Sequence, residues 1–188
     1  MESNLQDLNK SAINNGLVIG VISAVLGILT YYVAPNLMGS TFYGIGLGLV
    51  SLGLYIYFTL DLRKKVGGYW NFKSALKGIF LMAFIAGLFG MVFNFVFYKF
   101  IEPDAFEKIS GYITEGTTKT FENLGMQQDQ IDEAVEKQLG AMKSQFDPTF
   151  TDLAKNFGIA ILVQFIMSLI FAAIFKKEHP AFAPATEE

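Results

Sequence analysis

The sequence contains no cysteine and only one histidine, His179, which lies in the C-terminal stretch EHPAFAPATEE. The lack of cysteine excludes disulfides, iron–sulfur clusters and thiolate zinc sites, and is compatible with any cellular compartment. Phosphate-binding P-loops, H-E-x-x-H zinc motifs and G-x-S-x-G nucleophile motifs are also missing. Because catalysis needs a nucleophile, a base or a metal in a shared site, we expect no enzymatic activity, no metal and no cofactor. Residues 178–188, rich in proline, alanine and acidic residues, are expected to be disordered.

Charged side chains are missing from long parts of the chain, and residues 11–60 contain none. More than half of all residues are apolar, and phenylalanine alone supplies 19 of them. A helix that crosses a hydrocarbon core of ~30 Å needs ~20 mostly apolar residues. Strict apolar–polar alternation is absent, so the pattern predicts helices rather than barrel strands. The four stretches that qualify cover about residues 13–34, 42–60, 75–97 and 157–175.

The first of these stretches has an alternative interpretation as a secretory signal peptide. Its apolar run exceeds the ~7–15 residues of a signal-peptide core, and Glu2 and Asp7 stand where such a peptide is basic. A membrane span is therefore the preferred interpretation.

Lysine and arginine are concentrated on one side of the predicted spans. The short loop between the first two spans, PNLMGST, has neither residue. Basic residues follow the second and fourth spans instead: Arg63, Lys64, Lys65, Lys73, Lys77, Lys176 and Lys177. The positive-inside rule then places both termini in the cytoplasm and the long acidic connection, residues 102–156, outside. In a bacterial inner membrane this connection is periplasmic, and membrane lipid is the first expected partner.

The connection between the third and fourth spans is predicted to form a helical hairpin. Pro103 suits the first turn of a helix that continues outward from the third span, and Gly125 suits its end. A second helix is predicted over about residues 129–146. Asp147 then resembles an N-cap, with Pro148 at the first position of a helix that continues into the fourth span. Whether the hairpin lies on the membrane or projects from it stays open.

Apolar residues recur at helical spacing along the second hairpin helix and form one stripe. The stripe consists of Ile131, Val135, Leu139, Met142 and Phe146. We interpret it as a binding surface for a protein partner, with packing inside the hairpin or on the membrane surface as alternatives. The opposite, acidic face of this helix is interpreted as a solvated surface, because the ligand spacing of a calcium loop is missing.

Two amide side chains, Asn94 and Gln164, lie inside predicted spans. Because the third and fourth spans are antiparallel, both amides fall in the outer half of the bilayer. An amide is costly to bury without a partner, so we expect both to face the bundle interior. There they would bond to each other, to backbone or to water as structural contacts. A substrate-facing role is the alternative, since polar groups at this depth often mark pathways.

Small residues recur near one another on three of the spans and predict close helix packing. The positions are Gly16 and Gly20, Gly44 and Gly48, and, in looser pairs with alanine, Gly87 and Gly90. This spacing does not distinguish contacts within the chain from self-association.

The segments GGYWNFKSALKGIF and GMVFNFVFYKFIEPD flank the third span, and EKQLGAMKSQF precedes the fourth. In these segments, and over nearly the whole chain, the sequence resembles the family called domain of unknown function 4199. The resemblance implies a four-span inner-membrane protein of Bacteroidota, and it carries over no catalytic residue. Members of the family are often encoded beside membrane-attached glycosyltransferases. The resemblance therefore implies, by analogy alone, an accessory role in envelope glycan assembly.

The predicted structure is all-α: an integral membrane four-helix bundle with an outward-facing helical hairpin between the third and fourth spans. The favoured function is a non-catalytic accessory or scaffold protein that binds a membrane-protein partner or a second copy of itself, and no nucleic acid. The alternative is a small oligomeric transporter or channel subunit built around Asn94 and Gln164. A cavity that reaches Asn94 would favour transport, whereas a dry core with an exposed apolar patch would favour the scaffold.

Overall fold

In the computed structural model, which describes residues 2–178, the chain is all-α apart from one isolated β-bridge. The disorder expected for the C-terminal tail concerns a segment that, from His179 onward, lies outside the described residues. In chain order, the elements are α1 (Glu2–Val33), η1 (Pro35–Gly39), α2 (Thr41–Lys65), α3 (Phe72–Val96), η2 (Phe97–Ile101), α4 (Ala105–Asn123), α5 (Gln128–Phe146) and α6 (Phe150–Phe175).

Four of these helices are long and apolar enough to cross a membrane. This finding confirms the predicted all-α architecture, with a helical pair between the third and fourth spans. The candidate spans cover Asp7–Val33, Thr41–Lys65, Phe72–Ile101 and Phe150–Phe175. All four are longer than the predicted stretches, because a helix continues past its apolar residues until its end is capped.

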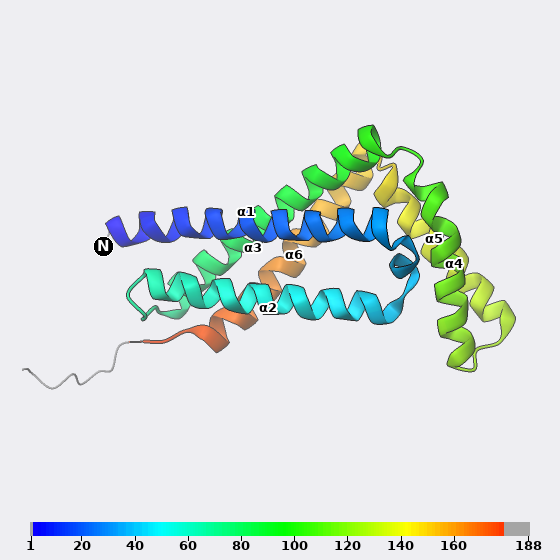
Figure 1. Cartoon of the computed structure of the whole chain (residues 1–188). Helices are drawn as coiled ribbons and strands as arrows, with labels where there is room; N and C mark the ends of the chain where they lie inside the picture. Colours follow the sequence, from blue (N-terminus) through cyan, green and yellow to red (C-terminus); the bar gives the residue numbers. More distant parts are fainter. Residues whose placement is uncertain (1, 179–188) are drawn as a thin grey trace, which may run out of the picture.

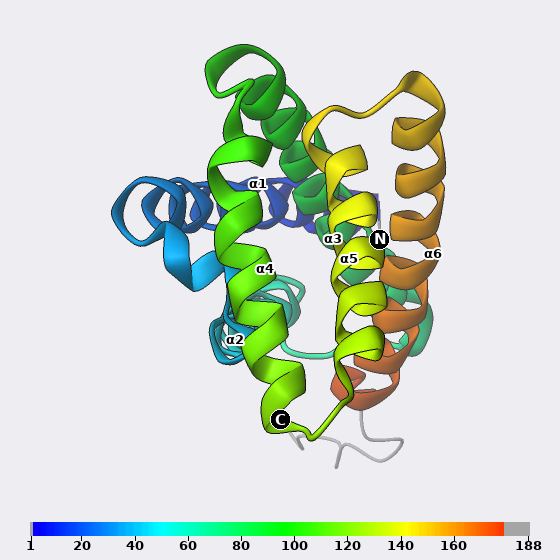
Figure 2. The same cartoon turned by 90° about the vertical axis from the view of Figure 1, so that its right-hand side faces the viewer.

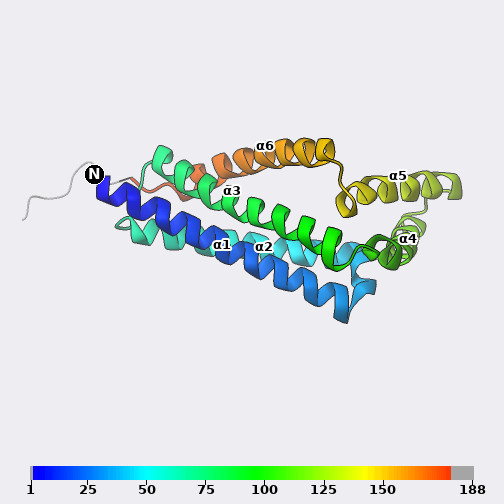
Figure 3. The same cartoon turned by 90° about the horizontal axis from the view of Figure 1, so that it is seen from above.

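The four long helices form an open arrangement with α3 at its centre. α3 packs against α1 and against α6, whereas α2 packs chiefly against α1 (Figures 1 and 3). α1 and α3 run in the same direction, since Gly16 of α1 faces Met82 and Tyr31 faces Phe97. The most extensive helix contact therefore joins a parallel pair, unlike an up-and-down bundle in which sequential antiparallel helices make the main contacts.

The contact between α1 and α3 depends on two glycines of α1. A Cβ atom at Gly16 would lie 2.5 Å from the carbonyl oxygen of Met82, and one at Gly20 would lie 2.7 Å from the ring of Phe89. Both distances are shorter than an ordinary carbon contact, so only glycine lets the two helices approach this closely. The buried core beside this contact includes Leu8, Ala12, Ile19, Ala75 and Ile79.

A buried tryptophan ties together the ends of α2, α3 and α6. The loop after α2 turns at Gly67 and Gly68, both with positive φ, and then places Trp70 in the core. The indole Nε1 of Trp70 donates a hydrogen bond to the carbonyl oxygen of Phe175 (2.9 Å). Its backbone exchanges two further hydrogen bonds with that of Lys177. This part of the molecule, with the basic residues in the last turn of α2, at the start of α3 and directly after α6, is called the basic end.

The opposite end of the long helices, called the hairpin end, is covered by α4 and α5. These two helices lie side by side across it (Figures 1 and 2). The prediction that the third span continues directly into the first hairpin helix is wrong. α3 is followed by η2, a turn of wider π-helix, and the chain then turns before α4 begins. Pro103 lies in this turn and not inside a helix; its ring removes the backbone N–H that a continuing helix would use.

The hairpin is held against the loop between α1 and α2 by a contact between two backbones. A Cβ atom at Gly116 of α4 would lie 2.1 Å from the carbonyl oxygen of Gly39 in η1. A Cβ atom at Gly39 would lie equally close, 2.1 Å, to the carbonyl oxygen of Tyr112. The hydroxyls of Thr41 and Thr120 share a hydrogen bond beside this contact (3.3 Å).

The apolar stripe of α5 is covered inside the hairpin. Ile131 and Phe146 are buried, and Val135, Leu139 and Met142 are half-buried. The ring of Phe146 packs against that of Tyr98, with 4.3 Å between the centroids. Leu139, Met142 and Phe146 of the stripe pack with apolar residues of α4 and of the end of α3, which corresponds to the alternative of packing inside the hairpin; binding of a partner by this stripe stays a prediction.

Local capping explains where the hairpin helices begin and end. Gly125, with a φ of 75°, follows α4 and ends it as predicted. Asp147 does not cap α6; Thr149 does so, in a capping box with Asp152. Asp147 instead forms an ion pair with Lys99 (2.5 Å).

Candidate functional site

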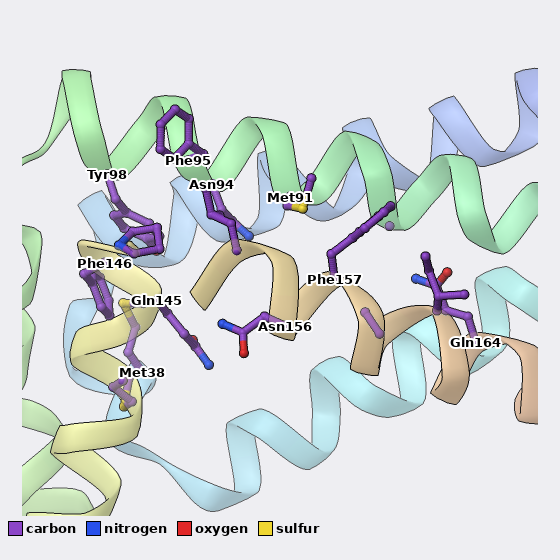
Figure 4. A pocket seen from close by; sticks show the side chains of 16 residues that line it. Met38, Met91, Asn94, Phe95, Tyr98, Gln145, Phe146, Asn156, Phe157 and Gln164 are labelled. Atoms are coloured by element: carbon purple, nitrogen blue, oxygen red, sulfur yellow. The ribbon is translucent and has the colours of Figure 1, made fainter. Parts of the chain in front are cut away.

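A cavity of about 360 Å³ lies near the hairpin end, where α3, α6 and the end of α5 meet (Figure 4). Four of its lining residues have amide side chains: Asn94, Gln145, Asn156 and Gln164. The others are mostly apolar, among them Met91, Phe95, Tyr98, Phe146 and Phe157. None of the lining residues carries a formal charge. We call this space the amide cavity.

Helical periodicity brings the amides to the cavity from three elements. Asn156 and Gln164 lie eight residues apart on α6, about two turns, and so share one face. On α3, Gly87 and Asn94 lie seven residues apart and likewise share a face. Gln145 comes from the last turn of α5, which the hairpin folds back against the end of α3 (Figure 4).

Gln164 rests on the backbone of α3. A Cβ atom at Gly87 would lie 2.1 Å from the Nε2 atom of Gln164, so the missing side chain of Gly87 makes room for the amide. Asn94 lies about 10 Å further along α3, seven residues at 1.5 Å each. The two amides identified in the sequence therefore border one cavity at different depths and do not bond to each other (Figure 4).

Two of the four amides, Gln145 and Asn156, were not identified in the sequence. Both lie outside the predicted spans, so neither stands out as a polar residue inside an apolar stretch. The spacing of Asn156 and Gln164 on one helix face is the signal that points to Asn156, once α6 is known to begin before it. Gln145 has no such signal, because only the fold of the hairpin places it beside α3.

The outer edge of the amide cavity is marked by charge. Lys99 and Asp147 form an ion pair here. Lys99 directly follows Tyr98 and Asp147 directly precedes Pro148, and both Tyr98 and Pro148 line the cavity. Both charged side chains are exposed. The cavity therefore lies between this charged edge and the apolar middle of the bundle.

A separate polar cluster connects helices at the hairpin end. The carboxylate of Glu102 accepts hydrogen bonds from the hydroxyls of Tyr31 (2.8 Å) and Tyr32 (2.7 Å) and forms an ion pair with Lys108 (2.5 Å). The hydrogen bond from Lys108, followed by those from the tyrosines, lowers the pKa of Glu102 to about 2. The bond to Glu102 in turn raises the pKa of Lys108. This cluster joins the end of α1 to the corner between α3 and α4.

The other small-residue positions predicted to pack helices lie in open surroundings. At Gly44, Gly48 and Gly90, a Cβ atom would have no heavy atom within 4 Å apart from its own local backbone. These three glycines make no close helix contact within residues 2–178, in contrast to the glycines of α1.

A model of the family described as "Protein of unknown function (DUF4199)" matches residues 14–177. The chain belongs to this family. The membership confirms the resemblance inferred from the segments around the third and fourth spans. No curated protein and no solved structure matches the chain.

In this DUF4199 protein, the whole lining of the amide cavity lies within the matched residues, from Met38 to Gln164. In the part of the chain that the structure describes, no three histidine, aspartate or glutamate side chains gather in a way that holds a metal ion. The chemistry that the cavity offers is hydrogen bonding by amides between apolar walls.

Proposed function

We propose that this DUF4199 protein is a non-catalytic, multi-pass protein of a bacterial inner membrane that binds an amphipathic molecule by its uncharged, hydrogen-bonding head group. The observation that carries the proposal is the cavity lined by four amides and by aromatic side chains, without charge. Its volume of about 360 Å³ falls in the ~300–1,000 Å³ range of small-molecule sites, which combine apolar walls with a few placed polar groups.

The chemistry of the lining selects a neutral, polar head group. Amides donate and accept hydrogen bonds, so they match hydroxyl and amide groups of a ligand. The side chains of Asn94 and Asn156 are exposed, so Asn94 does not face the bundle interior as expected, and both amides are free to bond to a ligand that enters the cavity. A charged head group would lose its hydration without an opposite charge in the lining to offset the loss.

The distribution of charge supports a periplasmic position for the amide cavity. Arg63, Lys64 and Lys65, with the lysines at the start of α3 and after α6, lie at the basic end, which the positive-inside rule assigns to the cytoplasm; the lysines of the hairpin end lie in or beside a long connection in which acidic residues outnumber them. In this orientation both termini are cytoplasmic and the hairpin is periplasmic. The cavity then lies in the outer leaflet, close to the lipid head groups.

Ligand binding is preferred to partner recognition by the α5 stripe as the basis of the function, because Leu139, Met142 and Phe146 of that stripe pack within the protein. An accessory role in envelope glycan assembly is compatible with this proposal, since saccharide head groups are uncharged and rich in hydroxyls. Transport by a small oligomer is the second candidate, and it is favoured by the cavity that reaches Asn94. Transport requires the ligand to cross the bilayer, whereas the proposal requires only binding.

The test is the binding of monooleoylglycerol, a neutral single-chain lipid, to the purified protein in lipid nanodiscs. A ligand at 100 times its Kd stabilises the folded state by about 2.7 kcal/mol, which a thermal melt detects. We expect the double variant Asn94→Leu/Asn156→Leu to lose most of this stabilisation. The matched control is Asn14→Leu, because Asn14 is an exposed amide of α1 that does not line the cavity.

Equal stabilisation of the wild type and the double variant would contradict the proposal, and so would the absence of any effect on the wild type. Transfer of a fluorescent monoacylglycerol across a liposome bilayer, abolished by Asn94→Leu, would favour transport over binding alone.

A further inference from the structure

A second cavity, of about 400 Å³, lies between α2 and α6 with α3 as its floor. Gly48 and Tyr55 of α2 lie on one side, and Met167 and Phe171 of α6 lie on the other. Apart from two serines, one tyrosine and Gln164, the lining is apolar. We call this space the lateral cleft.

The lateral cleft and the amide cavity meet at Gln164, which lines both. They also lie along one face of α3: Ile79 and Ala83 border the cleft, and Gly87 and Asn94 border the amide cavity. The spacings of four, four and seven residues keep these positions on one face of the helix. From Ile79 to Asn94, α3 rises about 22 Å.

The order of polarity along this face is that of a lipid, with a polar head group followed by an apolar chain. Hydrogen-bonding groups lie toward the hairpin end, beside the exposed ion pair, and apolar groups lie toward the middle of the bundle. The part of α3 between Ile79 and Gly87 rises about 12 Å and lies across the middle of the candidate span Phe72–Ile101, so a chain held there reaches the centre of the hydrocarbon core. α2 packs chiefly against α1 and only lightly against α3, so an acyl chain reaches the cleft from the bilayer, between α2 and α6.

We propose that the lateral cleft holds the acyl chain of a membrane lipid whose uncharged head group lies in the amide cavity. This inference rests on the proposed function, since the head group must bind where the amides are. It assigns the ligand to the neutral membrane lipids, and it excludes a water-soluble solute. Gln164 lies at the boundary, where the head group passes into the chain.

The test fills the cleft and leaves the amide cavity unchanged. A Cβ atom at Gly48 meets no heavy atom within 4 Å, so Gly48→Leu extends a side chain into open space beside the cleft without a clash. Gly53→Leu is the matched control, since Gly53 lies on the same helix in equally open surroundings and does not line the cleft. The probes are monooctanoylglycerol and monopalmitoylglycerol, which share one head group, with affinities expressed per mole fraction in the nanodisc bilayer.

We expect the wild type to bind the longer chain several-fold more tightly, because the added methylenes gain van der Waals contacts with the side chains of the cleft, the driving force that remains in lipid. Gly48→Leu should reduce this ratio to about one, with unchanged affinity for the shorter probe, and Gly53→Leu should preserve it. A long-chain probe with a mid-chain diazirine should label Leu52 or Met167 of the cleft more than the exposed Ile174 of α6.

Equal affinity of the wild type for both probes, or an unchanged ratio in Gly48→Leu, would overturn the inference and leave the proposed function standing. Failure of both probes to bind would overturn both. Photo-crosslinks that join Leu52 of one copy to a second copy would also overturn the inference, because the cleft would then be a protein interface.

Discussion

The contact between η1 and α4 yields a prediction whose size follows from the structure. In Gly116→Ala, the new Cβ atom would lie 2.1 Å from the carbonyl oxygen of Gly39, and 2.6 Å and 3.0 Å from its carbonyl carbon and Cα atom. All three neighbours are backbone atoms, so the clash is relieved only if α4 moves away from η1. Overpacking of this kind costs ~1–3 kcal/mol, while alanine gains about 1 kcal/mol over glycine inside a helix.

Gly111→Ala separates these two effects. Gly111 lies on the same helix, and a Cβ atom there meets no heavy atom within 4 Å, so this variant has the helix gain without the clash. The difference between the two variants should therefore be about 1–3 kcal/mol in the free energy of local opening. Hydrogen exchange of the α4 amides in nanodiscs, followed by mass spectrometry, should show exchange roughly 5- to 150-fold faster in Gly116→Ala than in Gly111→Ala. Equal exchange in the two variants would refute the backbone contact that holds the hairpin.

Three further outcomes are expected. The pKa of Glu102 is lowered to about 2, so the stability that its carboxylate contributes is full above the ordinary pKa of 4.5 and is lost as the pH falls toward 2. The melting temperatures at pH 3 and pH 7 should therefore lie closer together in Glu102→Gln than in Glu107→Gln. Glu107→Gln is the control, because it changes an exposed carboxylate. Trp70→Phe removes the hydrogen-bond donor to the part-buried carbonyl oxygen of Phe175 and should cost ~1–3 kcal/mol in the melt; an unchanged melting temperature would contradict the role of Trp70 in joining the helix ends at the basic end. Because the chain has no cysteine, single-cysteine variants report on which side of the membrane a residue lies. In spheroplasts, a membrane-impermeant maleimide should label Glu133→Cys directly and Lys73→Cys only after permeabilisation. The reverse labelling pattern would contradict the proposed orientation.

Local rules account for the parts of the fold that the sequence predicted well. The second hairpin helix was predicted at residues 129–146 and is observed at Gln128–Phe146. The glycine that ends α4 was identified because a left-handed residue closes a helix with little help from the rest of the fold. The N-cap of α6 was misplaced at Asp147 because the nearby Thr149 and Asp152 cap each other reciprocally, which satisfies two donors instead of one.

Two of the four amides that line the candidate site could be predicted from the sequence. Asn94 and Gln164 were identified because a polar group inside an apolar span is costly unless it has a role. Gln145 became a cavity residue only because the chain turns after η2 and carries α5 back to the end of α3. The same turn covers the α5 stripe, which in the sequence resembled a surface for a partner.

Two glycine pairs with the same spacing have different surroundings in the structure, a difference that the sequence does not indicate. Gly16 and Gly20 allow the close contact of α1 with α3, whereas Gly44 and Gly48, with the same spacing, lie in open surroundings. The sequence by itself determined that there are four apolar helices and a helical hairpin, because lipid requires every backbone group to be satisfied within its own segment. Only the tertiary structure decided which faces meet and where the cavities lie, because lipid solvates every apolar face about equally well and the choice is left to shape and to a few polar contacts.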